Sequence, residues 1–251
     1  MPSQAGLFFV VGNNMKIGVL AAGITPDELI DQHGSYADMI INLLNTTDEV
    51  FEFEVFDVRL DDFPSDLTQF DGWAISGSRN NVSENLPWMP KLKTLILDAH
   101  AAKQPIVGIC FGHQIIADAF GGKVDRYEGG WGLGLHTYDL ASGYENILGD
   151  QKQFSINAVH QDQVIKKPDN SEVLATSSFC KNAGLIYGDL ILTFQAHPEF
   201  KMDFEKDLIN VRAGDAFPME ESHAALASLE GQKTDSHSVA NWFAKFLVKH
   251  K

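Results

Sequence analysis

Short apolar runs alternate with longer segments of helical periodicity through the first half of the chain, and this alternation limits the fold more than any other feature. It is typical of βαβ units, whose strands pair in parallel and whose helices cover both faces of the sheet. We therefore predict an α/β fold, a three-layer, open and mainly parallel sheet flanked by helices. The predicted strands cover residues 17–22, 51–58, 72–75 and 105–109, and the predicted helices cover residues 27–44, 88–102 and 112–120.

The pattern changes from residue 123 onwards, where the apolar runs become shorter and lie closer together. Such runs are typical of antiparallel hairpins, which we expect as additions to the parallel sheet. A last helix is predicted over residues 241–249, and the acidic segment 200–235 is either a helical excursion or a partly ordered loop. The strand-like runs of this half cover residues 124–127, 134–140, 154–159, 172–176, 185–187 and 191–195.

No flexible linker divides residues 15–251, which we predict to form a single domain. Residues 1–14 contain an apolar stretch, but no lysine or arginine precedes it, so they do not match a secretory signal. We interpret them as a disordered leader. Because Met15 directly precedes the first predicted strand, a second hypothesis is that residues 1–14 extend the chain upstream of its natural start.

The net charge excludes some classes of partner. Acidic residues outnumber basic ones by 34 to 19, for a formal charge of −15, so nucleic acid and anionic membrane surfaces meet net repulsion. No apolar run reaches the roughly 18 residues that span a bilayer. The two cysteines, Cys110 and Cys180, are too few for a secreted disulfide scaffold and favour free thiols in a reducing compartment. We therefore predict a cytoplasmic protein.

One local pattern combines a buried strand with a cysteine between two glycines, Gly108-x-Cys110-x-Gly112, at the start of a helix. A residue at such a turn adopts a strained backbone conformation, and the glycines leave room where a side chain would meet neighbouring backbone. The amide groups and dipole of the helix N-terminus favour a thiolate there. Cys110 is thus a candidate nucleophile, although a lone cysteine in a tight turn fits a small buried residue equally well.

A second pattern, His197-Pro-Glu199, follows the strand-like run 191–195. Side chains two positions apart in an extended segment lie on one face, so Glu199 can orient the His197 imidazole. An imidazole held in this way can take a proton from a cysteine thiol and later return it. Because parallel strands end at the same edge of a sheet, we expect His197 to lie close to Cys110.

With these residues the chain resembles the class I, or triad-type, glutamine amidotransferase family. It is similar to the amidotransferase domain of GMP synthase and to stand-alone members that resemble γ-glutamyl peptidases. The resemblance runs from about residue 17 to residue 200, and it implies a flavodoxin-like fold. It rests on the cysteine pattern at 108–114, the His-Pro-Glu at 197–199, the Ser-Gly-Ser at 76–78 and the His-x-Asp at 160–162.

The resemblance also implies a role for each matching residue. Cys110 would be the nucleophile, His197 the general base and acid, and Glu199 the orienting carboxylate. The oxyanion hole would be formed by the amides of Gly77 and Phe111. The substrate would be bound by Gln114 and, at the mouth of the site, by His160 and Asp162, which would otherwise form a structural hydrogen-bonded pair.

Other motifs point away from metal and cofactor chemistry. The glycine-rich run at 129–134 lacks the preceding buried strand and following helix of a dinucleotide loop. The nine histidines show no paired metal-ligand spacing on a helix, so we predict neither a metal nor an organic cofactor. His113 is interpreted as a packing or capping residue, and Cys180 as a buried filler.

Three hypotheses for function follow. The first is a glutaminase-type amidotransferase that releases ammonia from glutamine through a Cys110 γ-glutamyl thioester and hands it to a separate synthase subunit. The second is a γ-glutamyl peptide hydrolase, and the third is an inactive binding or regulatory subunit. The 52 residues after Glu199 hold no glycine-rich phosphate loop, so we do not expect GMP synthesis by this chain alone. The predicted substrate in the first two cases is a small molecule, either glutamine or a γ-glutamyl compound.

Overall fold

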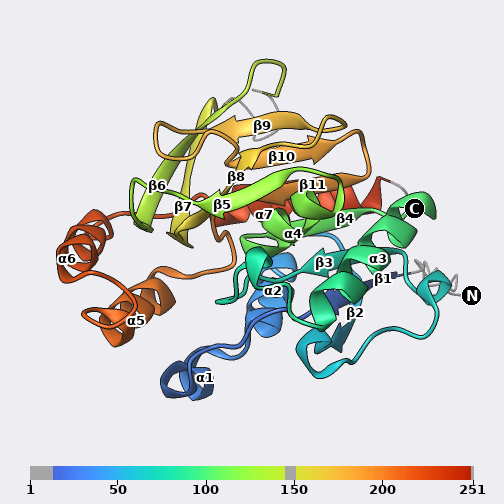
Figure 1. Ribbon diagram of the computed structural model, residues 1–251, viewed down its shortest axis with the longest axis horizontal. Helices are drawn as coiled ribbons and strands as arrows, with labels where there is room; N and C mark the ends of the chain where they lie inside the picture. The colour runs from blue at the N-terminus through green and yellow to red at the C-terminus, as the bar shows by residue number, and fades with distance from the viewer. Residues whose placement is uncertain (1–13, 145–150, 250–251) are drawn as a thin grey trace, which may run out of the picture.

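A nine-stranded sheet in the order β2-β1-β3-β4-β11-β10-β9-β6-β7 crosses the computed structural model, which describes residues 14–144 and 151–249 (Figure 1). The first five strands in this order pair in parallel, and the other four add antiparallel pairs. The predicted mainly parallel sheet with added hairpins is therefore confirmed. The parallel strands are β1 (Met15–Leu20), β2 (Phe51–Phe56), β3 (Gly72–Ile75), β4 (Ile106–Ile109) and β11 (Ile191–Phe194).

The antiparallel strands carry the sheet beyond β11. They are β10 (Gly184–Tyr187), β9 (Glu172–Thr176), β6 (Gly132–Leu140) and β7 (Gln153–His160). Two further strands, β5 (Lys123–Arg126) and β8 (Asp162–Lys166), pair with each other as a separate ribbon. Strand β8 is not among the predicted strands, because its residues alternate little and two lysines, Lys166 and Lys167, end the run.

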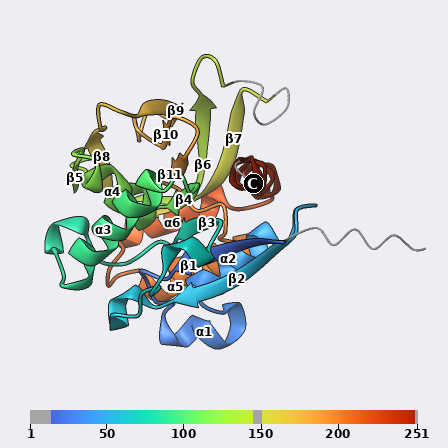
Figure 2. The ribbon, with the colours of Figure 1, turned by 90° about the vertical axis from the view of Figure 1, so that its right-hand side faces the viewer.

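Helices cover both faces of the sheet and complete the three predicted layers. Helices α3 (Trp88–Ala101) and α4 (Phe111–Ala119) lie on one side of the parallel strands, and α7 (Ser236–Val248) lies on the other with α2 (Tyr36–Leu44) (Figure 2). Every residue of the inner strands β3 and β4 is buried, as a position between two helical layers requires, whereas the edge strand β2 exposes Glu52 and Glu54. In the part of the chain that the structure describes, connections contain three short 3₁₀ helices: η1 (Val58–Leu60), η2 (Leu67–Gln69) and η3 (Val82–Glu84).

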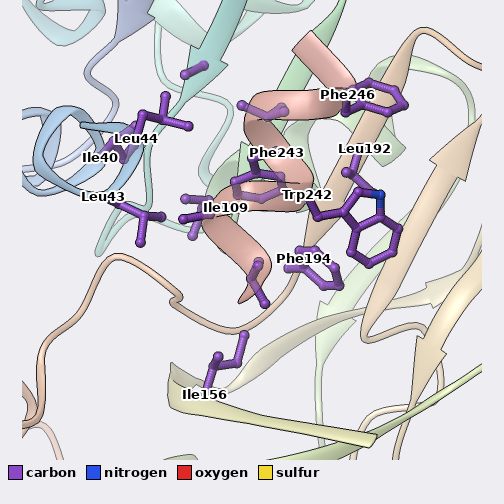
Figure 3. Close-up of a cluster of buried hydrophobic side chains, with 14 of the residues drawn as sticks. Ile40, Leu43, Leu44, Ile109, Ile156, Leu192, Phe194, Trp242, Phe243 and Phe246 are labelled. Atoms are coloured by element: carbon purple, nitrogen blue, oxygen red, sulfur yellow. The ribbon is translucent and has the colours of Figure 1, made fainter. Parts of the chain in front are cut away.

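The core under α2 and α7 is closed by aromatic residues of the last helix (Figure 3). Trp242 and Phe243 both pack on Phe194 of β11, with ring centroids 5.5 and 5.6 Å apart from it. This contact fixes the strand that precedes His197, so the C-terminal helix supports the site from behind. The helix begins at Ser236, five residues earlier than predicted.

The predicted helix over residues 27–44 is wrong as a single element. It is broken into α1 (Asp27–His33) and α2, because Gly34 adopts a positive φ of 79° and Ser35 starts a new helix. The Ser35 hydroxyl accepts from the Asp38 amide, and the Asp38 carboxylate accepts from the Ser35 amide, which together form a capping box. This break places Tyr36 at the first turn of α2.

The acidic segment 200–235 is the helical excursion of the two predicted alternatives. It contains α5 (Met202–Arg212) and α6 (Met219–Ser228), which pack with α1 around a separate apolar cluster that includes Phe200, Phe204 and Phe217.

Both cysteines are free and buried, as predicted. Within residues 14–144 and 151–249, no helix has the length and apolarity to cross a bilayer. Of the predicted leader, residues 1–14, all but Asn14 lie outside the described residues.

Candidate active site

Cys110 lies at a sharp turn between β4 and α4. Its backbone has φ 52° and ψ −102°, a positive φ that a residue with a side chain rarely adopts. Its amide donates to the carbonyl of Phe194 in β11, at 2.8 Å, so the turn is attached to the neighbouring parallel strand. The strained turn predicted from the glycine spacing is therefore present, with the cysteine at the N-terminus of a helix.

The two glycines beside Cys110 are required by close backbone approach. A Cβ atom on Gly112 would lie 2.5 Å from the carbonyl oxygen of Ile75, and one on Gly108 would lie 2.9 Å from the carbonyl carbon of Gly112. Both distances are well inside van der Waals contact, so the turn closes only without these side chains.

We expect Gly112→Ala to destabilise the protein by about 1–3 kcal/mol, the range for overpacking a filled interior. The sign is informative, because alanine is the better helix former by about 1 kcal/mol in an open helical position. Chemical denaturation gives the change in the free energy of unfolding. A Gly112→Ala protein as stable as the wild-type protein, or more stable, would show that steric contact with Ile75 is not what excludes a side chain.

His197 and Glu199 form a buried hydrogen-bonded pair directly after β11. The Nδ1 atom of His197 lies 2.7 Å from Oε1 of Glu199, and both side chains are almost fully buried. The His197 amide donates to the carbonyl of Asn157 at 2.8 Å. The Phe200 ring stacks on the imidazole with its centroid 3.9 Å away and the planes 7° apart. The imidazole is therefore fixed on one edge by a carboxylate and on one face by an aromatic ring.

Cys110, His197 and Gly77 meet at one point. A Cβ atom on Gly77 would lie 2.8 Å from Cε1 of His197 and 3.6 Å from Cβ of Cys110. Burial disfavours the charged imidazolium, but the carboxylate of Glu199 and the thiolate of Cys110 outweigh it and hold the pKa of His197 well above its ordinary value. The site therefore favours the protonated form of His197.

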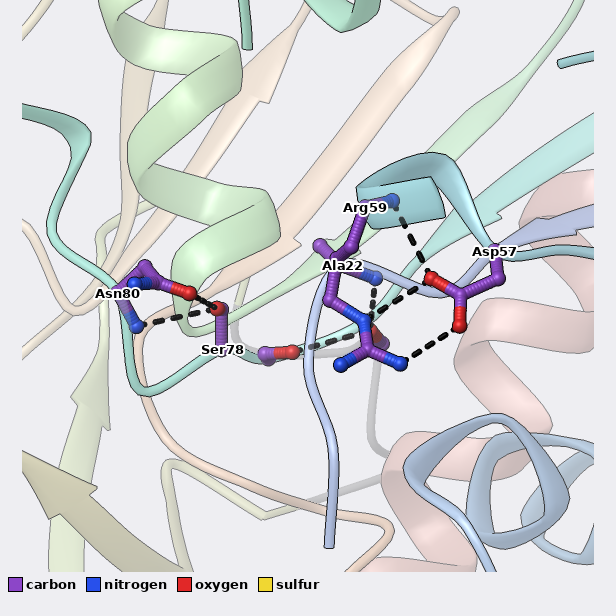
Figure 4. Close-up of polar contacts among 7 residues, drawn as sticks. Ala22, Asp57, Arg59, Ser78 and Asn80 are labelled. Carbon is purple, nitrogen blue, oxygen red and sulfur yellow. Dashed lines mark hydrogen bonds and ion pairs between the residues drawn. The ribbon is translucent and has the colours of Figure 1, made fainter. Parts of the chain in front are cut away.

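Hydrogen bonds among residues 76–80, and one from Ala22, hold the loop that carries Gly77 (Figure 4). The Ser76 hydroxyl accepts from the Ala22 amide at 2.9 Å and donates to the Gly77 carbonyl at 3.0 Å. The Ser78 hydroxyl accepts from the Asn80 amide at 3.1 Å. Phe111, the other predicted oxyanion residue, opens α4, where backbone amides have no partner within the helix.

The three predicted substrate residues lie around one cavity of about 630 Å³ that also contains Cys110 and His197. The Gln114 side-chain amide donates to the Asp162 carbonyl at 2.8 Å and to Oε1 of Gln195 at 3.1 Å. Both bonds of the Gln114 side-chain nitrogen are thus made to the protein itself. Its position in the cavity wall supports a role in shaping that wall.

His160 and Asp162 do not bond to each other through their side chains. Burial lowers the pKa of His160 to about 3, and neither ring nitrogen has a partner among the described residues. Burial also raises the pKa of Asp162, whose Oδ1 lies 3.8 Å from Nε of Arg126. His160 is therefore a buried, neutral imidazole in the wall of the cavity.

Sequence reasoning missed several residues at the site. Gln195 directs its side-chain amide at the Cys110 sulfur, at 3.7 Å. Gln195 directly follows β11 and precedes the turn that carries His197 and Glu199. Tyr36 also lines the cavity, and burial followed by the nearby Cys110 and Glu199 charges raises its pKa. No local pattern marks Tyr36, because helix α2 brings it in from the other end of the chain.

Glu205 on α5 is a fully buried carboxyl group near His197. One oxygen accepts from the Gly134 amide at 3.1 Å, and the other has no partner within the described part of the chain. Burial, opposed by the charge of His197 and by that hydrogen bond, raises the pKa of Glu205 to about 8. The group is therefore protonated in the folded protein at neutral pH.

This shift predicts a loss of stability with rising pH. Between the ordinary pKa of 4.5 and about 8 the folded state binds a proton that the unfolded state has released, so the free energy of unfolding falls as pH rises. The slope from this group is at most about 1.4 kcal/mol per pH unit. Glu205→Gln keeps an acceptor for the Gly134 amide and removes the titration. Urea denaturation at pH 5.5 and pH 8 should show a smaller decline for the variant, and an unchanged decline would contradict the assignment.

Comparison with known proteins agrees with this geometry. Residues 28–210 match the family model for glutamine amidotransferase class-I. The chain belongs to that family. Gamma-glutamyl peptidase 4 of Arabidopsis thaliana is 32% identical over 84% of this chain and 87% of its own. One of the subunits of the glutamine-hydrolyzing GMP synthase of Methanocaldococcus jannaschii is 35% identical over 50% of this chain and 69% of its own.

A solved structure shows the same fold over nearly the whole chain. The glutamine amidotransferase of Thermotoga maritima superposes with a TM-score of 0.71, at 17% identity, and covers 94% of this chain and 97% of its own. The class I amidotransferase resemblance inferred from the motifs is confirmed by the family model, and the solved structure confirms the fold. The family model ends at residue 210, so the end of α5 and all of α6 lie beyond it.

Proposed function

We propose that this protein is a cysteine amidohydrolase that cleaves γ-glutamyl amide bonds, with γ-glutamyl peptides as its substrates. The observation that carries the proposal is the His197 imidazole, held between the Glu199 carboxylate and Cys110 at the strained turn. Nucleophile, base and orienting acid in this order form the arrangement that covalent acyl transfer requires.

In the first half-reaction the Cys110 thiolate attacks the δ-carbonyl carbon of the γ-glutamyl group. A carbon–sulfur bond forms, and the carbonyl oxygen gains a negative charge, for which we propose the amides of Gly77 and Phe111 as hydrogen-bond donors. The carbon–nitrogen bond then breaks as His197 donates its proton to the departing amine. The product is a γ-glutamyl thioester on Cys110.

In the second half-reaction His197 removes a proton from water, and the resulting hydroxide attacks the thioester carbon. The carbon–sulfur bond breaks and releases glutamate. The imidazolium and the Cys110 thiolate are regenerated together, so the cycle closes with no net change in the enzyme. None of these steps needs a redox partner, because a peptide bond is simply hydrolysed.

Two observations favour γ-glutamyl peptides over free glutamine. The cavity of about 630 Å³ lies within the range of roughly 300–1,000 Å³ that accommodates drug-sized ligands, so it has room for a leaving group larger than ammonia. The similarity to an Arabidopsis γ-glutamyl peptidase also spans most of both chains, whereas the GMP synthase subunit matches half of this one.

A second candidate is hydrolysis of glutamine for a separate synthase subunit. The similarity to a glutamine-hydrolyzing GMP synthase subunit supports it, and the same three residues would perform the chemistry with ammonia as the leaving group. A synthase partner of this kind, like a cytoplasmic location, stays a prediction from the sequence.

A product assay on the purified chain separates these candidates. Glutamine and γ-glutamyl dipeptides would be offered in parallel, with the Cys110→Ala variant as the blank. Faster turnover of the dipeptides is the expected result. Turnover of glutamine alone would favour the synthase-linked candidate. The absence of turnover, together with a failure of Cys110 to react with a glutamine-like electrophile, would leave one surviving hypothesis, the inactive regulatory subunit.

A further inference from the structure

The arginines of this acidic chain are concentrated at the cavity. Of the four in the sequence, Arg79, Arg126 and Arg212 line it, whereas none of the lysines that the structure describes does. Arginine, rather than lysine, is the residue suited to a planar, two-point contact with a carboxylate. Nε of Arg126 lies 3.8 Å from Oδ1 of Asp162. The remaining arginine, Arg59, is bonded to Asp57 (Figure 4) and does not line the cavity.

Arg212 stands out among them because it is half-buried and has no ion pair or side-chain hydrogen bond among the described residues. It ends α5, where a cation is favoured by the helix dipole, but the dipole does not explain why the side chain faces a cavity. Phe204, Leu208 and Arg212 are spaced four residues apart and share one face of α5. Phe204 packs on Phe200, with ring centroids 4.5 Å apart, so this face leads from the stacked His197 ring along the cavity wall.

Asp215 brings the opposite charge to the same wall. It follows Arg212 by three residues in the tight connection between α5 and α6, lines the cavity, and forms no ion pair with Arg212. The connection is well defined by backbone bonds: the Arg212 carbonyl accepts from the Phe217 amide at 3.0 Å, and the Phe217 carbonyl accepts from the Gly214 amide at 2.8 Å. Phe217 itself is anchored on Trp131, with centroids 4.8 Å apart.

We infer that the 212–215 connection recognises the α-amino acid head group of the γ-glutamyl substrate, with Arg212 binding the α-carboxylate and Asp215 the α-ammonium group. A cation and an anion that are close in sequence but unpaired match a zwitterion. The amine that leaves from a γ-glutamyl peptide has its nitrogen in the scissile bond, so it offers no ammonium group until after cleavage. This inference rests on the proposed function, and it assigns the role to residues beyond the segment that matches the family model.

The test uses three fluorogenic amides of 7-amino-4-methylcoumarin, whose leaving group carries no carboxylate. The γ-glutamyl amide has the whole head group, the glutaryl amide lacks the α-ammonium, and the 4-aminobutyryl amide lacks the α-carboxylate. Arg212→Met should lower kcat/KM about 10- to 100-fold for the γ-glutamyl and glutaryl amides, as loss of a charged hydrogen bond does, and leave the 4-aminobutyryl amide unchanged. Asp215→Asn should lower it for the γ-glutamyl and 4-aminobutyryl amides and spare the glutaryl amide.

Lys206→Met is the matched control, because it removes a positive charge from the same helix without touching the cavity wall. It should leave kcat/KM unchanged for all three amides. Arg212→Gln serves as a second variant if Arg212→Met does not fold. Equal losses on all three amides would mean a structural role and overturn the inference, as would no loss on any. If the wild-type protein cleaves none of them and no γ-glutamyl dipeptide, the proposed function fails as well, whereas wild-type turnover without the variant pattern overturns the head-group assignment alone.

If Arg212→Met lowers kcat/KM for γ-glutamyl-alanine but not for the γ-glutamyl coumarin amide, Arg212 binds the carboxylate of the leaving group. That outcome also overturns the head-group assignment, and it would make Arg212 a determinant of the departing peptide instead.

Discussion

Replacing Cys110 with alanine is expected to lower turnover of γ-glutamyl substrates by about four to six orders of magnitude, the range seen when a nucleophile is removed from a catalytic triad. The fold should survive, because the change removes one sulfur atom and leaves the backbone of the turn as it is. The loss should fall on kcat, with KM for substrate nearly constant, since the cavity walls are untouched. Steady-state kinetics together with thermal unfolding measures both effects.

The strained backbone provides a sharper control. At φ 52° a side chain at position 110 is unfavourable, by roughly 1–3 kcal/mol at positions of this kind, and glycine relieves the strain. Cys110→Gly should therefore be as inactive as Cys110→Ala but at least as stable. If Cys110→Ala loses stability in proportion to activity, Cys110 is a structural residue and the nucleophile has been assigned wrongly.

The second large effect concerns the two other members of the proposed triad. His197→Ala should lower kcat about as much as Cys110→Ala does, because the residues act as one unit and no proton acceptor remains. Glu199→Gln should cost less, by a factor of about 10 to 100, since the imidazole can still accept a proton without its orienting carboxylate. Kinetics of the three variants under identical conditions gives the ranking. Equal losses for His197→Ala and Glu199→Gln would refute it.

Glu199→Gln should also change how the site titrates. Burial lowers the pKa of His197, and the Glu199 carboxylate is the largest of the influences that raise it. Without the carboxylate the burial remains, so the pKa of His197 falls and the imidazolium loses its proton at lower pH than in the wild-type protein. NMR titration of the His197 ring measures the shift directly. A pKa that stays unchanged in the variant would show that Glu199 does not control the charge of the imidazole.

Some of the residues on which these expectations depend could be predicted from a local sequence pattern, and others could not. The pattern Gly108-x-Cys110-x-Gly112 revealed the strained turn, because the steric demands of such a turn are local and only glycine meets them. His197 and Glu199 were paired correctly because they are only two residues apart, although the structure joins them through a turn after β11 and not through the extended segment that was predicted. The parallel sheet followed from apolar strands alternating with helices, a pattern that requires cover on both faces.

The sequence also contains a local signal for a helix break at Gly34 and Ser35, but the apolar periodicity on either side led to the prediction of one continuous helix. The helix predicted over 27–44 divides at Gly34 and Ser35, where a positive φ and a capping box end one helix and begin the next. The apolar periodicity of the two helices continues through this break, so periodicity alone predicts one element. The same break sets the position of Tyr36 at the cavity.

By itself the sequence determined the class of fold, the elbow at Cys110 and the pairing of His197 with Glu199, because each depends on residues that are neighbours along the chain. Only the tertiary structure decided what surrounds them. Phe200 stacking on the imidazole, the buried carboxyl of Glu205 and the arrival of Arg212 at the cavity depend on how α5 packs against the sheet. Such contacts form between residues that are far apart in the sequence. The free energy that stabilises them comes from the burial of many apolar side chains, so no local motif predicts them.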